Sequence, residues 1–410
     1  MSEWQKVKLG ELYEVHNGLS KGRQFFGTGF PFLTFSNVFN NWFLPEQLES
    51  LVQTTDKERE ACSIKAGDVF ITRTSETMDE LGMSSVALKD YPNATYNGFT
   101  KRLRPITDRV NPRYIGYYLR TSKFRGQFMA FSTMTTRASL ANNDLLNMEV
   151  ELPPMEIQHR IATILSRYDS LIENYQKQIK LLEEAAQRLY KEWFIDLHFP
   201  GHENTKIVDG VPEGWEKKKL SELFSFVRGK SYTSKELSDE GTIMVNLKNI
   251  QSFGGYKSDV EKHFIGTFKE EQTLMKGDLI MGVTDMTQER RLVGSVALIP
   301  DFKETATFSM DLIKLISFKL PNIYLYCAMR YGDVSRQIAP LANGVNVLHL
   351  KPEAISNIEM VVASDSIIEK FVSYTSKTIE SILSLQSQLR LLTEARDRLL
   401  PKLMSGEIEI

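Results

Sequence analysis

The chain repeats its own sequence at a nearly constant offset, and this repeat restricts the fold to two copies of one structural unit. Residues 4–12, WQKVKLGEL, return as residues 215–223, WEKKKLSEL, at an offset of 211 (215 − 4). Residues 65–71, KAGDVFI, return as residues 275–281, MKGDLIM, at an offset of 210 (278 − 68). Because further matches continue to Leu399, the repeat spans the whole chain of 410 residues.

Each copy is predicted to consist of a mixed globule followed by one long helix. Short β-rich runs such as residues 68–72 and 85–88 lie between glycine-marked turns, and a short helical stretch follows at residues 113–120. This pattern is typical of an α/β (mixed α+β) domain. The domains are expected at residues 1–154 and 200–364, and the helices at residues 155–199 and 365–410.

Both helical segments carry apolar residues at steps of three and four, which is the period of a packed helix face. The residues expected to pack between the helices are Ile161, Ile164, Tyr168, Leu171, Tyr175, Leu182, Leu189, Phe371, Tyr374, Leu385, Leu392 and Leu399. Gln178 and Gln388 would lie in the same seam, where a polar residue can fix the register. The simplest arrangement is an antiparallel coiled coil between the globules, with approximate two-fold symmetry. The alternative is that each helix packs only on its own globule.

The charge balance alone does not decide for or against a nucleic-acid partner. Fifty basic and 52 acidic residues give a formal net charge of −2, whereas phosphate binding usually requires a basic excess. Cys62 and Cys327 lie far apart and without metal-ligand spacing. The sequence shows no signal peptide and no apolar run of membrane-spanning length, so a reduced cytoplasm is the expected location.

Three stretches resemble the specificity subunits of type I restriction–modification enzymes. They are residues 152–165, LPPMEIQHRIATIL, residues 189–194, LYKEWF, and residues 211–216, VPEGWE. A proline pair and a Glu-x-Gln open a long helix, and a tryptophan then restarts the pattern, as at that family's domain junction. The second junction, residues 361–368, VVASDSII, lacks the proline pair and the Glu-x-Gln, so the start of the last helix stays open.

The resemblance implies two target-recognition domains, each contacting one half of a bipartite, asymmetric DNA sequence, with the helix pair as a spacer. It implies a non-catalytic chain that directs adenine methylation and restriction by two methyltransferase and two restriction subunits. S-adenosylmethionine, ATP and Mg²⁺ would bind those partners, and this chain would hold no cofactor and no metal. A helix of about 40 residues is roughly 60 Å long, which is about a turn and a half of B-DNA.

Arg, Lys, Asn, Gln, Ser and Thr side chains contact base edges and phosphates, and such residues cluster in loops of both globules. In the first globule the candidate DNA-binding residues are Lys21, Arg23, Thr34, Ser36, Asn37, Arg73, Thr74, Ser75, Asn97, Thr100, Lys101, Arg102, Thr136 and Arg137. In the second they are Arg228, Lys230, Ser231, Asn246, Lys248, Asn249, Thr284, Arg290, Arg291, Asn343 and Asn346. Any one of them could be a solvated loop residue, so the prediction depends on clusters that recur at matching positions, as Asn37 and Asn249 do.

A self-sufficient DNA methyltransferase is a weaker alternative. Residues 25–29, FFGTG, match the glycine loop that binds S-adenosylmethionine, and residues 111–114, NPRY, partly match a catalytic N-P-P-Y loop. Pro31 stands where a helix should begin, and Arg113 replaces the second proline. A turn at the glycines and a helix opened by Pro112 explain the same residues.

The histidines suggest no metal site. Pro200 and Gly201 interrupt the i, i+4 pair His198 and His202, which excludes a regular helical face for zinc. The sequence contains no recognisable catalytic constellation. A coiled-coil scaffold that never meets DNA, and a specificity protein of another restriction class, stay open as alternatives. Salt-dependent binding to duplex DNA would separate the scaffold from the DNA-reading functions.

Overall fold

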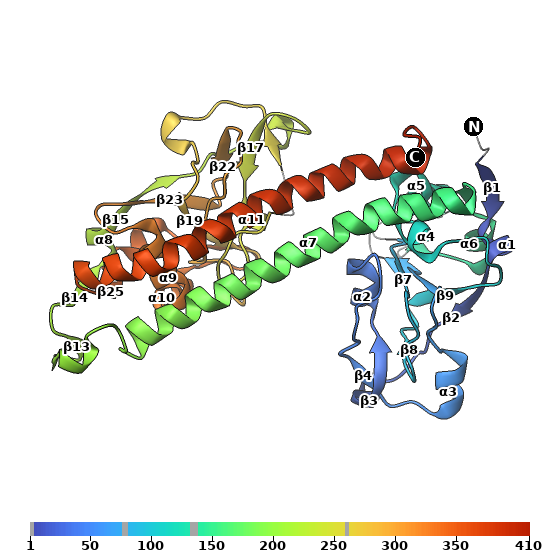
Figure 1. Ribbon diagram of the computed structural model, residues 1–410, viewed down its shortest axis with the longest axis horizontal. Helices are drawn as coiled ribbons and strands as arrows, with labels where there is room; N and C mark the ends of the chain where they lie inside the picture. The colour runs from blue at the N-terminus through green and yellow to red at the C-terminus, as the bar shows by residue number, and fades with distance from the viewer. Residues whose placement is uncertain (1–3, 76–80, 132–137, 259–261) are drawn as a thin grey trace. The chain divides into compact units, whose positions relative to one another are not determined.

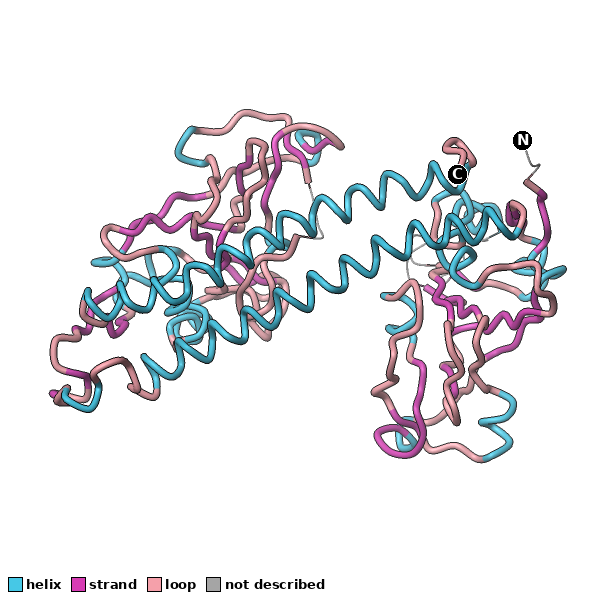
Figure 2. The backbone as a smooth tube through the Cα atoms, viewed as in Figure 1, coloured by secondary structure: helices cyan, strands magenta, loops and turns pink. Residues whose placement is uncertain are grey.

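The chain divides into two units, each containing one globule and part of both long helices. The computed structural model describes residues 4–75, 81–131, 138–258 and 262–410 (Figure 1). Unit 1 comprises Met1–Asp169 with Ala395–Ile410, and unit 2 comprises Ser170–Glu394. The long helices are α7 (Met155–Tyr190) and α11 (Asp365–Ser405), and Figure 2 shows both as continuous helices. The expected class, tandem mixed α/β domains with long helices, is confirmed, while the domain bounds drawn from the sequence stay a prediction.

An antiparallel four-stranded sheet forms the centre of unit 1. Its order is β2 (Tyr13–Asn17), β9 (Thr100–Pro105), β5 (Val69–Thr72) and β7 (Ser84–Val86). Three smaller sheets surround it, namely β4 (Leu51–Val52) with β3 (Phe26–Leu33) and β8 (Thr95–Tyr96), β1 (Gln5–Lys8) with β11 (Glu149–Leu152), and β6 (Thr74–Ser75) with β10 (Ala138–Ser139). All four residues of β5 are buried, which fits its inner position in the sheet.

Short α-helices complete unit 1. They are α1 (Leu9–Leu12), α2 (Phe35–Asn40), α3 (Asp56–Ala61), α4 (Pro112–Tyr118), α5 (Ser122–Phe131) and α6 (Asn142–Asn147). Of these, α2 contacts the inner strand β5 and the edge strand β7 of the central sheet, and α4 contacts β7. Helix α4 begins at Pro112 because the Asn111 side chain accepts hydrogen bonds from the backbone N–H groups of Arg113 and Tyr114. The NPRY stretch is therefore a helix start, as predicted from Pro112, and not a catalytic loop.

Unit 2 repeats the central sheet with the same strand order. Its strands are β15 (Phe224–Arg228), β23 (Leu312–Ser317), β19 (Leu279–Gly282) and β21 (Val296–Leu298). The smaller pairings are β14 (Glu216–Lys219) with β25 (Glu359–Val362), β20 (Thr284–Asp285) with β24 (Leu348–His349), and β12 (Ile207–Val208) with β13 (Val211–Pro212). A second four-stranded sheet contains β16 (Leu237–Ser238), β18 (His263–Phe264), β17 (Thr242–Val245) and β22 (Ala306–Phe308), and the short helices are α8 (Leu220–Leu223), α9 (Asn322–Tyr331) and α10 (Val334–Ile338).

The two long helices pack against each other inside each unit, in antiparallel directions. In unit 1, Ile161 and Ile164 near the start of α7 share a core with Leu399 near the end of α11. In unit 2, residues from the end of α7 share a core with residues from the start of α11, among them Tyr175, Leu182, Leu189, Phe371, Leu385 and Leu392. Both helices also contact the globules, so helix pairing and packing on the globule occur together.

Along α7 the buried face contains the residues that directly follow two expected seam positions, Leu171 and Gln178. Ile172, Ile179 and Ala186 follow one another at seven-residue steps and are buried, whereas Leu171 is 43% exposed. Gln178 lies on the same outward face as Leu171 and is exposed. On α11, Tyr374 is 66% exposed and Gln388 is exposed. The packing expected for Leu171 and the seam position of both glutamines are therefore wrong, while Tyr168 is half-buried. The Tyr374 ring, although largely exposed, packs edge-on against Trp193 at 5.8 Å.

The start of α11 does not need the proline pair that opens α7. The carbonyl of Ser364 accepts hydrogen bonds from the N–H groups of Ile367 and Ile368, so the helix begins at Asp365. Pro401 lies inside the last turns of α11, and the helix continues to Ser405. No helix among the described residues is long and apolar enough to cross a membrane.

Candidate nucleic-acid interface

A glycine holds a loop directly against a neighbouring strand end at the same place in both units. A Cβ atom on Gly18 would lie 2.1 Å from the carbonyl oxygen of Asn97, and one on Gly229 would lie 1.9 Å from that of Ser309. Only glycine allows such an approach. In unit 1 the contact is completed by Leu19, whose carbonyl accepts a 2.9 Å hydrogen bond from the Gly98 N–H.

A short antiparallel pairing of two strands that are distant in the sequence follows this loop contact in each unit. In unit 1 the Arg73 N–H donates to the carbonyl of Phe99 at 3.0 Å, and β6 then pairs with β10. In unit 2 the Val283 N–H donates to the carbonyl of Asp311 at 2.9 Å, and β20 pairs with β24. We call these neighbouring segments the loop edge, defined as residues 17–23, 73–75, 97–101 and 138–142 in unit 1, and residues 228–231, 283–292, 309–312 and 343–350 in unit 2.

Most candidate residues at the unit 1 loop edge are only partly accessible. Arg23 is exposed, whereas Arg73 and Asn97 are half-buried. The Lys21 ammonium lies 2.7 Å from Glu58, and this hydrogen bond holds the pKa of the Glu58 carboxyl below its usual range. Lys21 is therefore already neutralised by a partner within its own unit. Thr136 and Arg137 lie outside the described residues, as do the side chains of Thr74 and Ser75.

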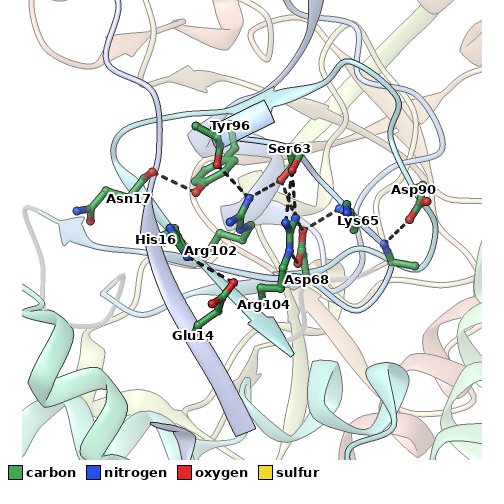
Figure 3. Close-up of polar contacts among 12 residues, drawn as sticks. Glu14, His16, Asn17, Ser63, Lys65, Asp68, Asp90, Tyr96, Arg102 and Arg104 are labelled. Carbon is green, nitrogen blue, oxygen red and sulfur yellow. Dashed lines mark hydrogen bonds and ion pairs between the residues drawn. The ribbon is translucent and has the colours of Figure 1, made fainter. Parts of the chain in front are cut away.

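Arg102 is a structural residue, which corrects its assignment as a DNA contact. It is 2% exposed, and it donates a 2.7 Å hydrogen bond to the carbonyl of Ser63 (Figure 3). Its neighbour Arg104, which was not among the candidates, binds both carboxylate oxygens of Asp68 at 2.8 and 2.7 Å. Asp68 also accepts from the Lys65 N–H at 2.7 Å. This network ties the Lys65 turn to strand β9 and leaves Arg102 no access to DNA.

Thr100 and Lys101 are also buried, at 0% and 4% exposure. The Lys101 ammonium contacts the side-chain amide oxygens of Asn17 and Asn142. Burial, together with the charge of Arg73, lowers the pKa of Lys101 below its usual range. In unit 2 the matching position on β23 is Ile313, so the fold itself does not require a lysine at this place in the sheet.

Four further candidates close helix starts, and this use explains why they recur at matching positions. Thr34 and Asn37 form a reciprocal pair at the start of α2, with both backbone-to-side-chain hydrogen bonds at 3.1 Å. Asn246 and Asn249 form the equivalent pair in unit 2, where the Asn246 N–H donates to Asn249 at 3.0 Å. Asn246 and Asn249 are 5% and 2% exposed. Their recurrence therefore reflects capping, and the DNA contacts assigned to these two buried residues are corrected.

The unit 2 loop edge offers the larger number of accessible candidates. Thr284 is buried at 5% exposure and lies in the β20–β24 pairing, which removes it as a surface contact. Lys230 and Arg290 are half-buried. The exposed candidates of unit 2 are Arg228, Ser231, Lys248, Arg291, Asn343 and Asn346, and Ser36 is exposed in unit 1. Arg228 forms a 2.6 Å ion pair with Glu353, but both side chains are more than half exposed, so the pair can open to a phosphate at little cost.

The residues that suggested other chemistry have structural explanations. Gly27 and Gly29 have φ angles of 101° and 105° in β3, where the pairing with β4 is irregular. The His198 and His202 rings lie 5.3 Å apart, because the chain turns at Gly201 instead of continuing as a helix. The two histidines thus meet despite the interrupted helix. Within the described part of the chain, no group of three or more His, Cys, Asp or Glu side chains is placed to hold a metal ion.

Comparisons with known proteins agree on one family. Residues 1–184 match the family model described as a type I restriction modification DNA specificity domain. The chain is 26% identical to the type I restriction enzyme MjaIX specificity subunit of Methanocaldococcus jannaschii, over 100% of this chain and 94% of the relative. It is 22% identical to the HindI specificity subunit of Haemophilus influenzae, over the full length of both.

A solved structure shows the same fold. The type I restriction–modification S subunit from M. genitalium superposes with a TM-score of 0.59 at 15% identity, covering 98% of this chain and 96% of that one. The repeat, the paired long helices and the two loop edges are thus found together with family similarity along the chain. Residues 1–184 thus match the family's DNA specificity domain, and the whole chain is similar to type I restriction–modification specificity subunits.

Proposed function

We propose that each unit reads one half of a bipartite, asymmetric DNA sequence through its loop edge. The observation that supports this is one backbone arrangement carrying different side chains in the two units. Asn17 at the unit 1 edge corresponds to Arg228 in unit 2, and both are exposed. Half-buried Arg73 likewise corresponds to Val283, which is buried. A shared frame with different contact groups suits a site whose two halves differ in sequence.

The chain itself is proposed to be non-catalytic and to direct adenine methylation and restriction by partner subunits. Two methyltransferase and two restriction subunits would complete the complex, which fits a chain built from two copies of one unit. S-adenosylmethionine, ATP and Mg²⁺ would bind those partners, and the complex would act in the cytoplasm. The specificity-subunit names of the relatives support this division of labour.

Methylation mapping tests the proposal directly. A strain carrying this gene and a gene for the methyltransferase subunit should show N6-methyladenine at one split, asymmetric motif. Deletion of this gene should abolish methylation at that motif. An unchanged methylation pattern would remove DNA specificity from this chain and favour a scaffold role.

The salt dependence of DNA binding tests where the DNA lies. Each phosphate contact removed should reduce the slope of log K against log salt by about 0.9. We expect Arg23→Ala and Arg228→Ala each to reduce the slope by roughly that amount without changing the methylated motif. Arg188→Ala is the matched control, because Arg188 is an exposed cation on α7, outside the loop edge. A slope that responds to Arg188 and not to the other two would place the DNA elsewhere.

A further inference from the structure

Two loops of unit 2 are joined into one projecting element, which we call the finger, residues 284–292 and 343–349. Strands β20 and β24 pair at its base, where Thr284 lies opposite His349. The Gln288 side chain donates a 2.7 Å hydrogen bond to the carbonyl of Val345 and links the two loops. The sequence interpretation named Asn343, Asn346, Arg290 and Arg291 here but did not identify Gln288 or Val345.

A buried carboxylate organises the first loop of the finger. Asp285 is 0% exposed, and both of its oxygens are used within the finger. One oxygen accepts from the N–H and the hydroxyl of Thr287, at 2.8 and 2.9 Å, and the other accepts from the N–H of Leu292 at 2.7 Å. Three hydrogen bonds to one buried carboxylate fix the path of the loop from Asp285 to Leu292.

The exposed residues of the finger include amides and apolar side chains. Val345 is 87% exposed and Met286 is 75% exposed, although each is apolar. Asn346 is exposed, and no described residue hydrogen-bonds its side chain. Arg291, the exposed cation of the first loop, is paired with Glu289. The second loop, residues 343–349, contains no Lys, Arg, Asp or Glu, so it is poorly suited to phosphate. Its exposed amide beside an exposed methyl-bearing side chain instead matches the major-groove edge of an A·T base pair.

We infer that Asn346 and Val345 read an A·T base pair in the half-site contacted by unit 2, and that Asp285 positions the finger for this contact. The Asn346 amide would accept from adenine N6 and donate to adenine N7. The Val345 methyl groups would contact the thymine 5-methyl group. This inference rests on the proposed function, since it requires that unit 2 bind duplex DNA.

Base analogues test each contact separately in the assembled methyltransferase complex. Once the methylated motif is known, each A·T pair of both half-sites is replaced in turn by 7-deazaadenine·T, which lacks N7, or by A·uracil, which lacks the methyl group. At one pair of the unit 2 half, we expect 7-deazaadenine to weaken wild-type binding about tenfold and uracil about threefold. Asn346→Ala should be insensitive to 7-deazaadenine, and Val345→Ala should be insensitive to uracil.

A control residue and a milder variant keep the test interpretable. Asn357→Ala changes an exposed asparagine of unit 2 outside the loop edge, and it should retain both analogue effects. Asp285→Asn should weaken both analogue effects together while leaving the salt slope of binding unchanged. If Asp285→Asn does not fold, Thr287→Val removes only the hydroxyl hydrogen bond and should show a smaller loss of the same two effects.

The outcomes separate the inference from the proposed function. If Asn346→Ala and Val345→Ala keep the analogue sensitivities of the wild type at every A·T pair, or lose them only in the other half-site, the inference is wrong while the proposed function stands. If the complex shows no motif that depends on this chain, the proposed function fails first. Equal loss of binding to specific and random DNA in Asn346→Ala would also overturn base reading, because it would indicate a phosphate contact.

Discussion

Arg330 on α9 donates hydrogen bonds to both carboxylate oxygens of Glu183 on α7, at 2.8 and 2.9 Å. The two side chains are only 11% and 13% exposed. The pair therefore attaches the globule of unit 2 to the helix face through a buried, bidentate contact. The sequence separation of 147 residues shows that this contact joins segments far apart in the chain.

Glu183→Gln should lower the free energy of unfolding of unit 2 by about 3 kcal/mol, because Arg330 would keep its buried charge without a counter-charge. Thermal unfolding of the full chain measures the effect. Glu184→Gln is the control, because the ion pair of Glu184 with Arg188 is long, at 4.0 Å, and both side chains are exposed. That substitution should change stability by less than about 0.5 kcal/mol. Equal effects of the two variants would contradict the assigned role of the Arg330 contact.

Asp68 and its counterpart Asp278 should differ in their importance, although the repeat matches them. Asp68 is fully buried and binds Arg104 with both oxygens, so Asp68→Asn should cost about 3 kcal/mol. Asp278 accepts from the Met275 N–H at 2.8 Å, and its ion pair with Lys314 spans 3.7 Å, so Asp278→Asn should cost about 1 kcal/mol.

Hydrogen–deuterium exchange can locate these two effects. Asp68→Asn should reduce amide protection in β5 and β9 of unit 1, and Asp278→Asn should produce a smaller loss in β19 and β23 of unit 2. A larger loss of amide protection in Asp278→Asn than in Asp68→Asn would contradict this prediction. It would show that the bidentate contact with Arg104 does not determine the loss of stability.

The repeat predicted the fold class because a constant offset requires each copy to form the same unit. The glycine loops also follow from sequence, since Gly18 and Gly229 recur at places where a side chain would collide with a neighbouring carbonyl. The helix face was less predictable. Leu171 and Ile172 are adjacent apolar residues, and the periodic pattern alone cannot decide which of them faces the core.

The candidate DNA contacts show a second limit of sequence. Arg102 is buried because Ser63, which is 39 residues away, supplies its hydrogen-bond acceptor. Asn249 recurs at the position of Asn37 because both close a helix start, and capping selects the same polar residues as DNA contact does. A polar residue that recurs in both copies can therefore be a helix cap or a DNA contact. Only its burial in the structure distinguishes the two roles.

Glycine-to-alanine substitutions should lower the stability of the fold at two sites and raise it at a third. Gly18→Ala and Gly229→Ala should each cost about 2 kcal/mol or more, because the new Cβ would meet a backbone carbonyl. Gly126 lies within α5, and a Cβ there would meet none of the described residues within 4 Å. Gly126→Ala should therefore stabilise unit 1 by about 0.5 to 1 kcal/mol through helix propensity. Thermal midpoints of the three variants check the signs, and destabilisation by Gly126→Ala would contradict the open space around that residue.

The two cysteines should be inert toward thiol reagents while the protein is folded. Cys327 is 0% exposed, and burial raises the pKa of its thiol to about 12. Cys62 is 8% exposed, and burial raises the pKa of its thiol as well. Only the thiolate reacts, so labelling by a disulfide reagent at pH 8 should be at least about a hundredfold slower than in denaturant. The variant Cys62→Ser isolates the reaction of Cys327.

The raised pKa of Cys327 also predicts that the fold loses stability as the pH becomes alkaline. The folded chain keeps this proton up to a pKa of about 12, whereas an unfolded thiol loses it near pH 8.5. Above that lower value the folded state binds more protons than the unfolded state, so the stability contributed by the neutral thiol falls as the pH rises toward 12. Cys327→Ala removes this contribution. Its stability should therefore decrease less steeply than that of the wild type between pH 8.5 and 10, and parallel curves would show that Cys327 ionises equally in both states.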